Sequence, residues 1–250
     1  VVNASMTFCS NLYTHLMIDS NDNGVIIINA NNIDVDCSGA SIGGDRTAGS
    51  FGISISGKSN VSIQGCAITN YSSYGIYSPS GNNVSLINNT IYNNVEYGVG
   101  FDTVSNYTIN KSSIYGNGLS GIFAGVRSGT ISNNTFHSNS NYGIRLTGST
   151  ANSTIEWNII YNNTLSGIHG NSAQNVTFRN NTIYNNKQQG IEWFSSSANA
   201  TIVENTIYNN TLNGIFFQST SDNNVTRNNI TSNILAGINI STTVSRTIIY

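Results

Sequence analysis

The stretch NNTIYNNVEYGVGF, residues 88–101, decides how this chain folds because it recurs along the sequence. Near copies are NNTIYNNKQQGIEWF at residues 180–194 and ENTIYNNTLNGIFF at residues 204–217. Every copy contains a Gly followed by an aliphatic residue, and these glycines recur every 22 to 24 residues, at Gly52, Gly75, Gly98, Gly121, Gly143, Gly167, Gly190, Gly214 and Gly237. Gly24 starts an earlier, looser copy. A period of this length is typical of a solenoid.

Apolar residues occupy fixed columns relative to these glycines. Seven residues before them stand Ile68, Ile91, Ile114, Phe136, Ile160, Ile183, Ile207 and Ile230. Twelve residues before them stand Ile63, Leu86, Ile109, Ile131, Ile155, Phe178, Ile202 and Val225, and Ile248 is expected to continue this column. Apolar and polar residues alternate within each short run, which indicates strands with one buried face. We therefore predict an all-β coil with three short strands per rung and about nine or ten rungs, stacked in parallel about 4.8 Å apart.

Asparagine forms two further columns. One lies four residues before the Gly, at Asn94, Asn117, Asn139, Asn163, Asn186, Asn210 and Asn233. The other lies nine residues before it, at Asn89, Asn134, Asn158, Asn181, Asn205 and Asn228, with Cys66 and Ser112 as exceptions. Asn suits turns, and stacked amides can bond one another along the axis, so we expect inward Asn ladders at two corners. We expect the repeated Gly to adopt a conformation that a Cβ would forbid.

The NNTIYNN…GI unit resembles the repeat of the pectin-lyase-like superfamily over about residues 50–250, and more loosely over residues 24–50. The resemblance implies a single-stranded right-handed parallel β-helix. We predict an N-terminal cap at residues 1–24 and a β-helix at residues 25–250 with an uncapped C-terminal end. That end is expected to meet a further domain or another subunit. The superfamily includes polysaccharide lyases and hydrolases, tailspikes, adhesins, surface-layer proteins and a copper-maturation factor, so the fold alone does not choose a function.

The composition restricts the possible partners. Only 8% of residues are charged and the net charge is −2, with basic residues scattered rather than gathered into a stripe, which argues against nucleic-acid binding. No apolar run reaches about 18 residues, so we expect no membrane span. A removed signal peptide, or a start made by cloning or proteolysis, would explain the missing initial Met. No Cys or His spacing indicates a metal, and we expect no cofactor.

The second residue after each Gly should point outward. This column contains Arg145, His169 and Glu192 on successive rungs, with Tyr77, Phe123 and Phe216 elsewhere along it. Three interpretations are open: a cross-strand charge ladder, a ligand-binding surface in which the rings contact sugar, or a catalytic site in which His169 acts as acid or base. Superfamily hydrolases carry clustered Asp residues and a Gly-His-Gly, whereas this chain has only GIHG at residues 167–170 and no Asp-Asp pair.

A second outward column lies six residues before the Gly, at Tyr92, Tyr115, His137, Tyr161, Tyr184 and Tyr208. Rings one rung apart can stack and stabilise the sheet surface. The alternative is an aromatic strip that contacts a glycan or a protein partner.

Cysteines and sequons bear on the compartment. A Cys9–Cys37 disulfide would attach the N-terminal segment to the first rung and leave Cys66 as a buried thiol, although sequence alone does not determine the pairing. One column of N-x-Ser/Thr sequons supplies N-glycosylation candidates at Asn60, Asn83, Asn106, Asn152, Asn175 and Asn199.

Two functions follow from these features. The first is a secreted structural or adhesive cell-surface glycoprotein, a rigid rod that assembles into a sheath, surface layer or filament. The alternative is a polysaccharide lyase, glycoside hydrolase or glycan-binding module that uses the column around His169.

Overall fold

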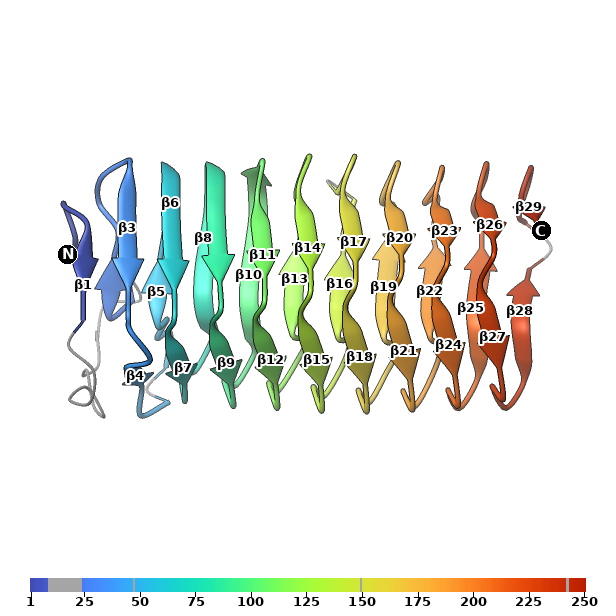
Figure 1. Cartoon of the computed structure of the whole chain (residues 1–250), viewed down its shortest axis with the longest axis horizontal. Coiled ribbons are helices and arrows are strands. Elements are labelled where there is room, and N and C mark those ends of the chain that lie inside the picture. Colours follow the sequence, from blue (N-terminus) through green and yellow to red (C-terminus); the bar gives the residue numbers. More distant parts are fainter. Residues whose placement is uncertain (9–23, 47, 149, 242) are drawn as a thin grey trace.

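The computed structural model describes residues 1–8, 24–46, 48–148, 150–241 and 243–250, and these form a right-handed parallel β-helix of about ten rungs. The rungs stack along the long axis of the molecule, with the N-terminal rung at one end and the C-terminal rung at the other (Figure 1). Each rung contributes strands to three faces, which we call the first, second and third sheets. This architecture confirms the predicted fold.

The three sheets follow one another around each rung. The first sheet contains β2 (Ile26–Ile27), β5 (Ile53–Ser54), the start of β8 (Tyr74–Ile87), β10 (Tyr97–Ser105), β13 (Ile122–Ala124), β16 (Ile144–Leu146), β19 (Ile168–Asn171), β22 (Ile191–Phe194), β25 (Asn213–Gln218) and β28 (Ala236–Ile240). The second contains β1 (Met6–Thr7), β3 (Ile33–Asp36), β6 (Lys58–Gln64), the end of β8, β11 (Thr108–Asn110), β14 (Thr130–Ser132), β17 (Thr154–Glu156), β20 (Thr177–Arg179), β23 (Thr201–Val203), β26 (Asn224–Thr226) and β29 (Ile248–Ile249). The third contains β4 (Ser41–Gly43), β7 (Ala67–Thr69), β9 (Thr90–Tyr92), β12 (Ser113–Tyr115), β15 (Thr135–His137), β18 (Ile159–Tyr161), β21 (Thr182–Tyr184), β24 (Thr206–Tyr208) and β27 (Asn229–Thr231). No helix capable of crossing a membrane occurs in these described ranges.

The predicted apolar columns fill the interior. Ile91, Ile114 and Ile160 are completely buried, and Ile91 lies in register with Ile114 on the next rung. The last rung departs from the prediction by one residue, because Val225 pairs with Ile249 rather than with Ile248. The prediction for Ile248 was therefore wrong. The preceding corner sets this register, since Ser221 pairs with Ser245.

The Asn pairs of the repeat have a structural explanation. The first Asn of a pair, such as Asn162, is exposed and has a positive φ of 54°, a conformation that Asn tolerates better than most residues. The second, Asn163, is buried, and its Nδ2 donates to Oδ1 of Asn186 at 3.0 Å. Along this ladder, from Asn94 to Asn233, the side-chain bonds measure 2.9–3.1 Å. The predicted Asn ladders are confirmed.

The repeated Gly is required for a reason other than the predicted one. None of the nine glycines from Gly52 to Gly237 has a positive φ, so the expected conformational reason was wrong for them; the earlier, looser copy at Gly24 does have one, at 96°. A Cβ on Gly167 would instead lie 2.8 Å from the carbonyl oxygen of Gly190 and 2.7 Å from Cγ2 of Ile183. The next rung approaches so closely that no side chain fits.

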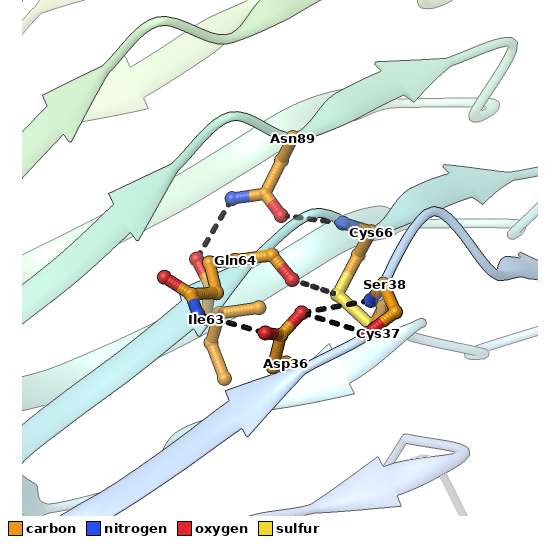
Figure 2. The surroundings of a disulfide bond; sticks show 7 residues. All are labelled: Asp36, Cys37, Ser38, Ile63, Gln64, Cys66 and Asn89. Carbon is orange, nitrogen blue, oxygen red and sulfur yellow. Dashed lines mark hydrogen bonds between the residues drawn. A yellow bond between two sulfur atoms is a disulfide. The ribbon is translucent and has the colours of Figure 1, made fainter. Parts of the chain in front are cut away.

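The disulfide joins Cys37 to Cys66, so the predicted Cys9–Cys37 pairing and the free Cys66 thiol were wrong (Figure 2). Cys66 lies in the column that holds Asn in most other rungs, and its backbone N–H donates to Oδ1 of Asn89 at 3.0 Å. Register places Cys66 one rung above Cys37, with Cα atoms 4.8 Å apart. Cys9 lies outside the described residues.

The first residues of the chain belong to the β-helix. β1 pairs in parallel with β3, and Val2 forms a bridge with Ile28. Within the predicted cap at residues 1–24, Val2 and β1 therefore extend the sheets of the β-helix. Residues 9–23 lie outside the described part of the chain. The partner predicted for the C-terminal end stays a prediction.

Candidate functional site

The outward column of the first sheet brings the predicted site residues together. Arg145 on β16 pairs with His169 on β19, and His169 pairs with Glu192 on β22. Phe123 precedes them and Phe216 follows them in the same register. The predicted juxtaposition is confirmed, because parallel strands in register carry equivalent residues to the same face.

His169 and Glu192 form a hydrogen-bonded pair. The Nδ1 atom of His169 lies 2.9 Å from Oε2 of Glu192, which also accepts from Oγ of Ser166 at 3.0 Å. A carboxylate only accepts, so Nδ1 carries the proton and neutral His169 has its lone pair at Nε2. The imidazole is only 6% exposed, because it stacks on Tyr142 with ring centroids 4.4 Å apart and also contacts Phe194.

Arg145 carries a charge that no carboxylate in the described part of the chain neutralises by direct contact. Its guanidinium lies over Phe123, 5.4 Å from the ring centroid, and its buried Nε has no hydrogen-bond partner. Burial raises the pKa of the neighbouring Tyr142 hydroxyl, and Glu192 raises it further while Arg145 lowers it. The charges of Glu192 and Arg145 therefore both influence the Tyr142 hydroxyl.

An aromatic cluster extends this surface towards the N-terminal rungs. Tyr74 stacks on Tyr77 and Tyr97, with centroids 4.6 and 5.2 Å away, and Phe51 and Phe123 close the two ends. Gly100 makes the packing possible, because a Cβ there would lie 2.3 Å from the Tyr74 ring.

Tyr77 is anchored within this cluster. Its hydroxyl donates to Asp102 at 2.7 Å, and burial, followed by this bond, raises its pKa to about 12.

The sequence interpretation missed Tyr74, Tyr97 and Tyr142, although a signal for them exists. All three stand immediately before a repeated Gly, at Gly75, Gly98 and Gly143. Their rings lie beside the outward column and partly cover it, so equivalent residues of the first sheet have quite different exposure.

The outward column of the third sheet is a continuous stack of six rings. Tyr92, Tyr115, His137, Tyr161, Tyr184 and Tyr208 have centroid separations of 4.7–5.2 Å and interplanar angles of 4–13°. Neighbouring rings cover one another's faces, so the strip presents ring edges and hydroxyls to solvent. This geometry matches the sheet-stabilising interpretation. Contact with a glycan through this strip stays a prediction.

The sequon column lies on the surface. Asn60, Asn83, Asn106, Asn152, Asn175 and Asn199 are all exposed and all have positive φ. Neighbouring amides bond one another: Nδ2 of Asn83 donates to Oδ1 of Asn60 at 2.8 Å, and Nδ2 of Asn175 to Oδ1 of Asn152 at 3.1 Å. The positions are accessible, and their modification stays a prediction.

A family model described as "Right handed beta helix region" matches residues 4–149 and 97–250. No curated protein matches the chain significantly. Among solved structures, an alginate lyase from Paenibacillus sp. str. FPU-7 has a TM-score of 0.74 at 20% identity, with 88% of this chain and 87% of that chain covered.

Two further structures are similar. The periplasmic alginate epimerase AlgG has a TM-score of 0.68 at 17% identity and covers 90% of this chain, which in turn spans 62% of the epimerase. The Dettilon tailspike protein has a TM-score of 0.69 at 18% identity, with 81% of this chain and 45% of that chain covered. At these identities the likeness establishes the fold alone.

Proposed function

The chain belongs to the right-handed β-helix family, and we propose that it binds an acidic glycan of the uronate class on its first sheet. The observation that carries the proposal is Arg145, a cation on a surface of aromatic rings with no carboxylate partner among the described residues. A guanidinium matches a carboxylate geometrically and bonds it more strongly than a neutral donor would. The nearby Phe123 and Tyr97 rings suit contact with the apolar faces of sugars.

The comparisons support this substrate class. Two of the similar structures are an alginate epimerase and an alginate lyase, and alginate is a polymer of uronic acids. A polyuronate carries a carboxylate on every sugar, whereas a neutral glycan offers no anionic group for Arg145 to bind.

Enzymatic turnover of the uronate glycan is the second candidate function, and the His169–Glu192 pair favours it. Nε2 of His169 would accept the proton at C5, next to the uronate carboxylate, while Arg145 stabilises the developing charge. Protonation of C5 from the opposite face by solvent gives the epimer. Cleavage of the C4–O bond, with the proton on His169 passing to the leaving oxygen, instead gives an unsaturated product. Because Tyr142 and Phe194 pack on the imidazole and leave His169 only 6% exposed, a substrate has little room to approach it, so we rank binding first.

The test is calorimetric titration with polymannuronate and polygalacturonate oligosaccharides. Arg145→Gln is expected to weaken binding about 10- to 100-fold, the equivalent of about 1.5–3 kcal/mol for a charged hydrogen bond. The matched control is Arg179→Gln, which removes the same charge from the second sheet and leaves binding unchanged. Absence of binding by the wild type, or equal loss in both variants, would overturn the proposal.

Turnover is measured on the same samples. Ultraviolet absorbance detects the unsaturated product and proton NMR detects the epimer. His169→Gln keeps a donor for Glu192 and is expected to abolish any turnover while preserving binding. A turnover rate unaffected by this change would remove His169 from the mechanism.

The Cys37–Cys66 disulfide indicates a non-cytoplasmic location. We extend this to a secreted or cell-surface position, with glycan on part of the Asn60–Asn199 sequon column. Intact mass before and after deglycosylation tests this extension. The structural or adhesive role predicted from composition stays a prediction.

A further inference from the structure

One corner of the β-helix carries a residue that does not suit its backbone. In seven rungs the residue ten positions before the repeated Gly turns the chain from the second to the third sheet with a positive φ of 53–57°, at Asn88, Lys111, Asn133, Trp157, Asn180, Glu204 and Arg227. Asn tolerates this conformation, whereas a bulky side chain there is an outlier. Trp157 holds it with a φ of 56°.

Few contacts with the rest of the fold compensate for the backbone strain at Trp157. Its side chain is 57% exposed, and it makes no aromatic contact within the described ranges. Strained residues that the surrounding structure does not explain are found mainly at functional sites. Trp157 is therefore a candidate for an external contact.

A second apolar residue lies beside it on the same rung. Ile159 is 43% exposed, at a position where neighbouring rungs carry Thr135 and Thr182. Between Trp157 and Ile159, Asn158 points inward and continues the buried ladder. This rung thus carries apolar residues at two surface positions where neighbouring rungs carry polar ones, while its interior keeps the same pattern.

These two side chains line a surface hollow of about 380 Å³ that extends over the next two rungs. Its polar lining includes Asn180, Thr182, Glu204 and Thr206. Glu204 is paired with Arg227 at 3.0 Å, so the rim presents amide and hydroxyl groups together with a neutralised carboxylate. The lining repeats at the rung spacing of about 4.8 Å.

We propose that this hollow binds a neutral hexose-based oligosaccharide, with a sugar ring stacked on Trp157. An exposed indole beside amide and hydroxyl groups suits a pyranose, which has apolar faces and a hydroxylated edge. The paired charge of Glu204 gives no preference for an acidic ligand. The site lies at the corner between the second and third sheets, so it is independent of the uronate surface on the first sheet.

The intrinsic fluorescence of Trp157 can report binding at this hollow. The chain contains only two Trp residues, and the other one, Trp193, is completely buried. Binding of cellotetraose, mannotetraose or chitotetraose to Trp157 is expected to shift the emission to shorter wavelength in a saturable manner and to protect it from acrylamide quenching. Lys111→Asn is the matched control, because it makes the same kind of change at the same corner of another rung, outside the hollow, and it leaves this titration unchanged.

The decisive variant is Trp157→Asn, which installs the residue found at this corner in other rungs. It is expected to abolish oligosaccharide binding by calorimetry while raising the denaturant midpoint, because the backbone strain is relieved. A purely structural Trp157 would instead lower that midpoint and overturn the inference. Failure of all three neutral tetrasaccharides to bind, or binding of only a polymannuronate tetrasaccharide, would also overturn it.

Discussion

Removal of one rung of the inner Asn ladder is the most direct test of what holds this β-helix together. Asn163 is completely buried, and its Oδ1 accepts from the backbone N–H of Asn139 at 3.1 Å and from Nδ2 of Asn139 at 3.0 Å. In Asn163→Ala the buried backbone N–H of Asn139 loses this acceptor, and Nδ2 of Asn139 keeps only the carbonyl oxygen of Ile114, at 3.4 Å. Each unsatisfied buried group costs about 1–3 kcal/mol, so the expected loss in the free energy of unfolding is roughly 2–6 kcal/mol.

The matched control is Asn162→Gly, one residue earlier. Asn162 is exposed with a φ of 54°, a conformation that Gly adopts freely, so we expect a change within about 0.5 kcal/mol. Both variants are expressed without glycosylation and compared by urea denaturation. Because each rung contacts only its neighbours, amide hydrogen exchange should also increase most around residues 139 and 163. Equal stability of the two variants would refute the idea that the ladder stabilises the fold.

Two further predictions concern the disulfide and the ring stack. Replacing Cys37 and Cys66 together by Ser is expected to destabilise the chain by about 3–4 kcal/mol, because the bond closes a span of 29 residues in the unfolded chain; reductant should then have no further effect on the variant in denaturation experiments. Burial lowers the pKa of His137, so the folded state disfavours the protonated ring, and stability is expected to fall as pH drops from about 6.5 through the lower folded-state pKa. His137→Tyr should reduce the difference in thermal midpoint between about pH 7.5 and about pH 5, and an unchanged difference would exclude His137 as its source.

The repeat made most of the architecture predictable. Columns such as Ile91, Ile114 and Ile160 recur at one period, and stacked parallel strands are the arrangement that buries all of them while satisfying the backbone. The same alignment placed Arg145, His169 and Glu192 side by side, because a residue's position within the repeat determines its face.

The errors arose where contacts depart from the repeat. The Cys37–Cys66 bond depends on the exact register of the first rungs, which contain an insertion and obscure the period. The role of Gly167 depends on how closely the next rung approaches, a distance that the sequence does not contain.

By itself, the sequence determined the period, the inward and outward columns and the ladder residues, because each reflects a regularity that many copies repeat. Only the tertiary structure decided which outward residues are accessible. His169 belongs to an outward column and yet is covered by Tyr142 and Phe194, while Trp157 occupies a corner suited to Asn and remains exposed. Such differences come from side chains that lean across from neighbouring columns, and alternation along a single strand does not encode them.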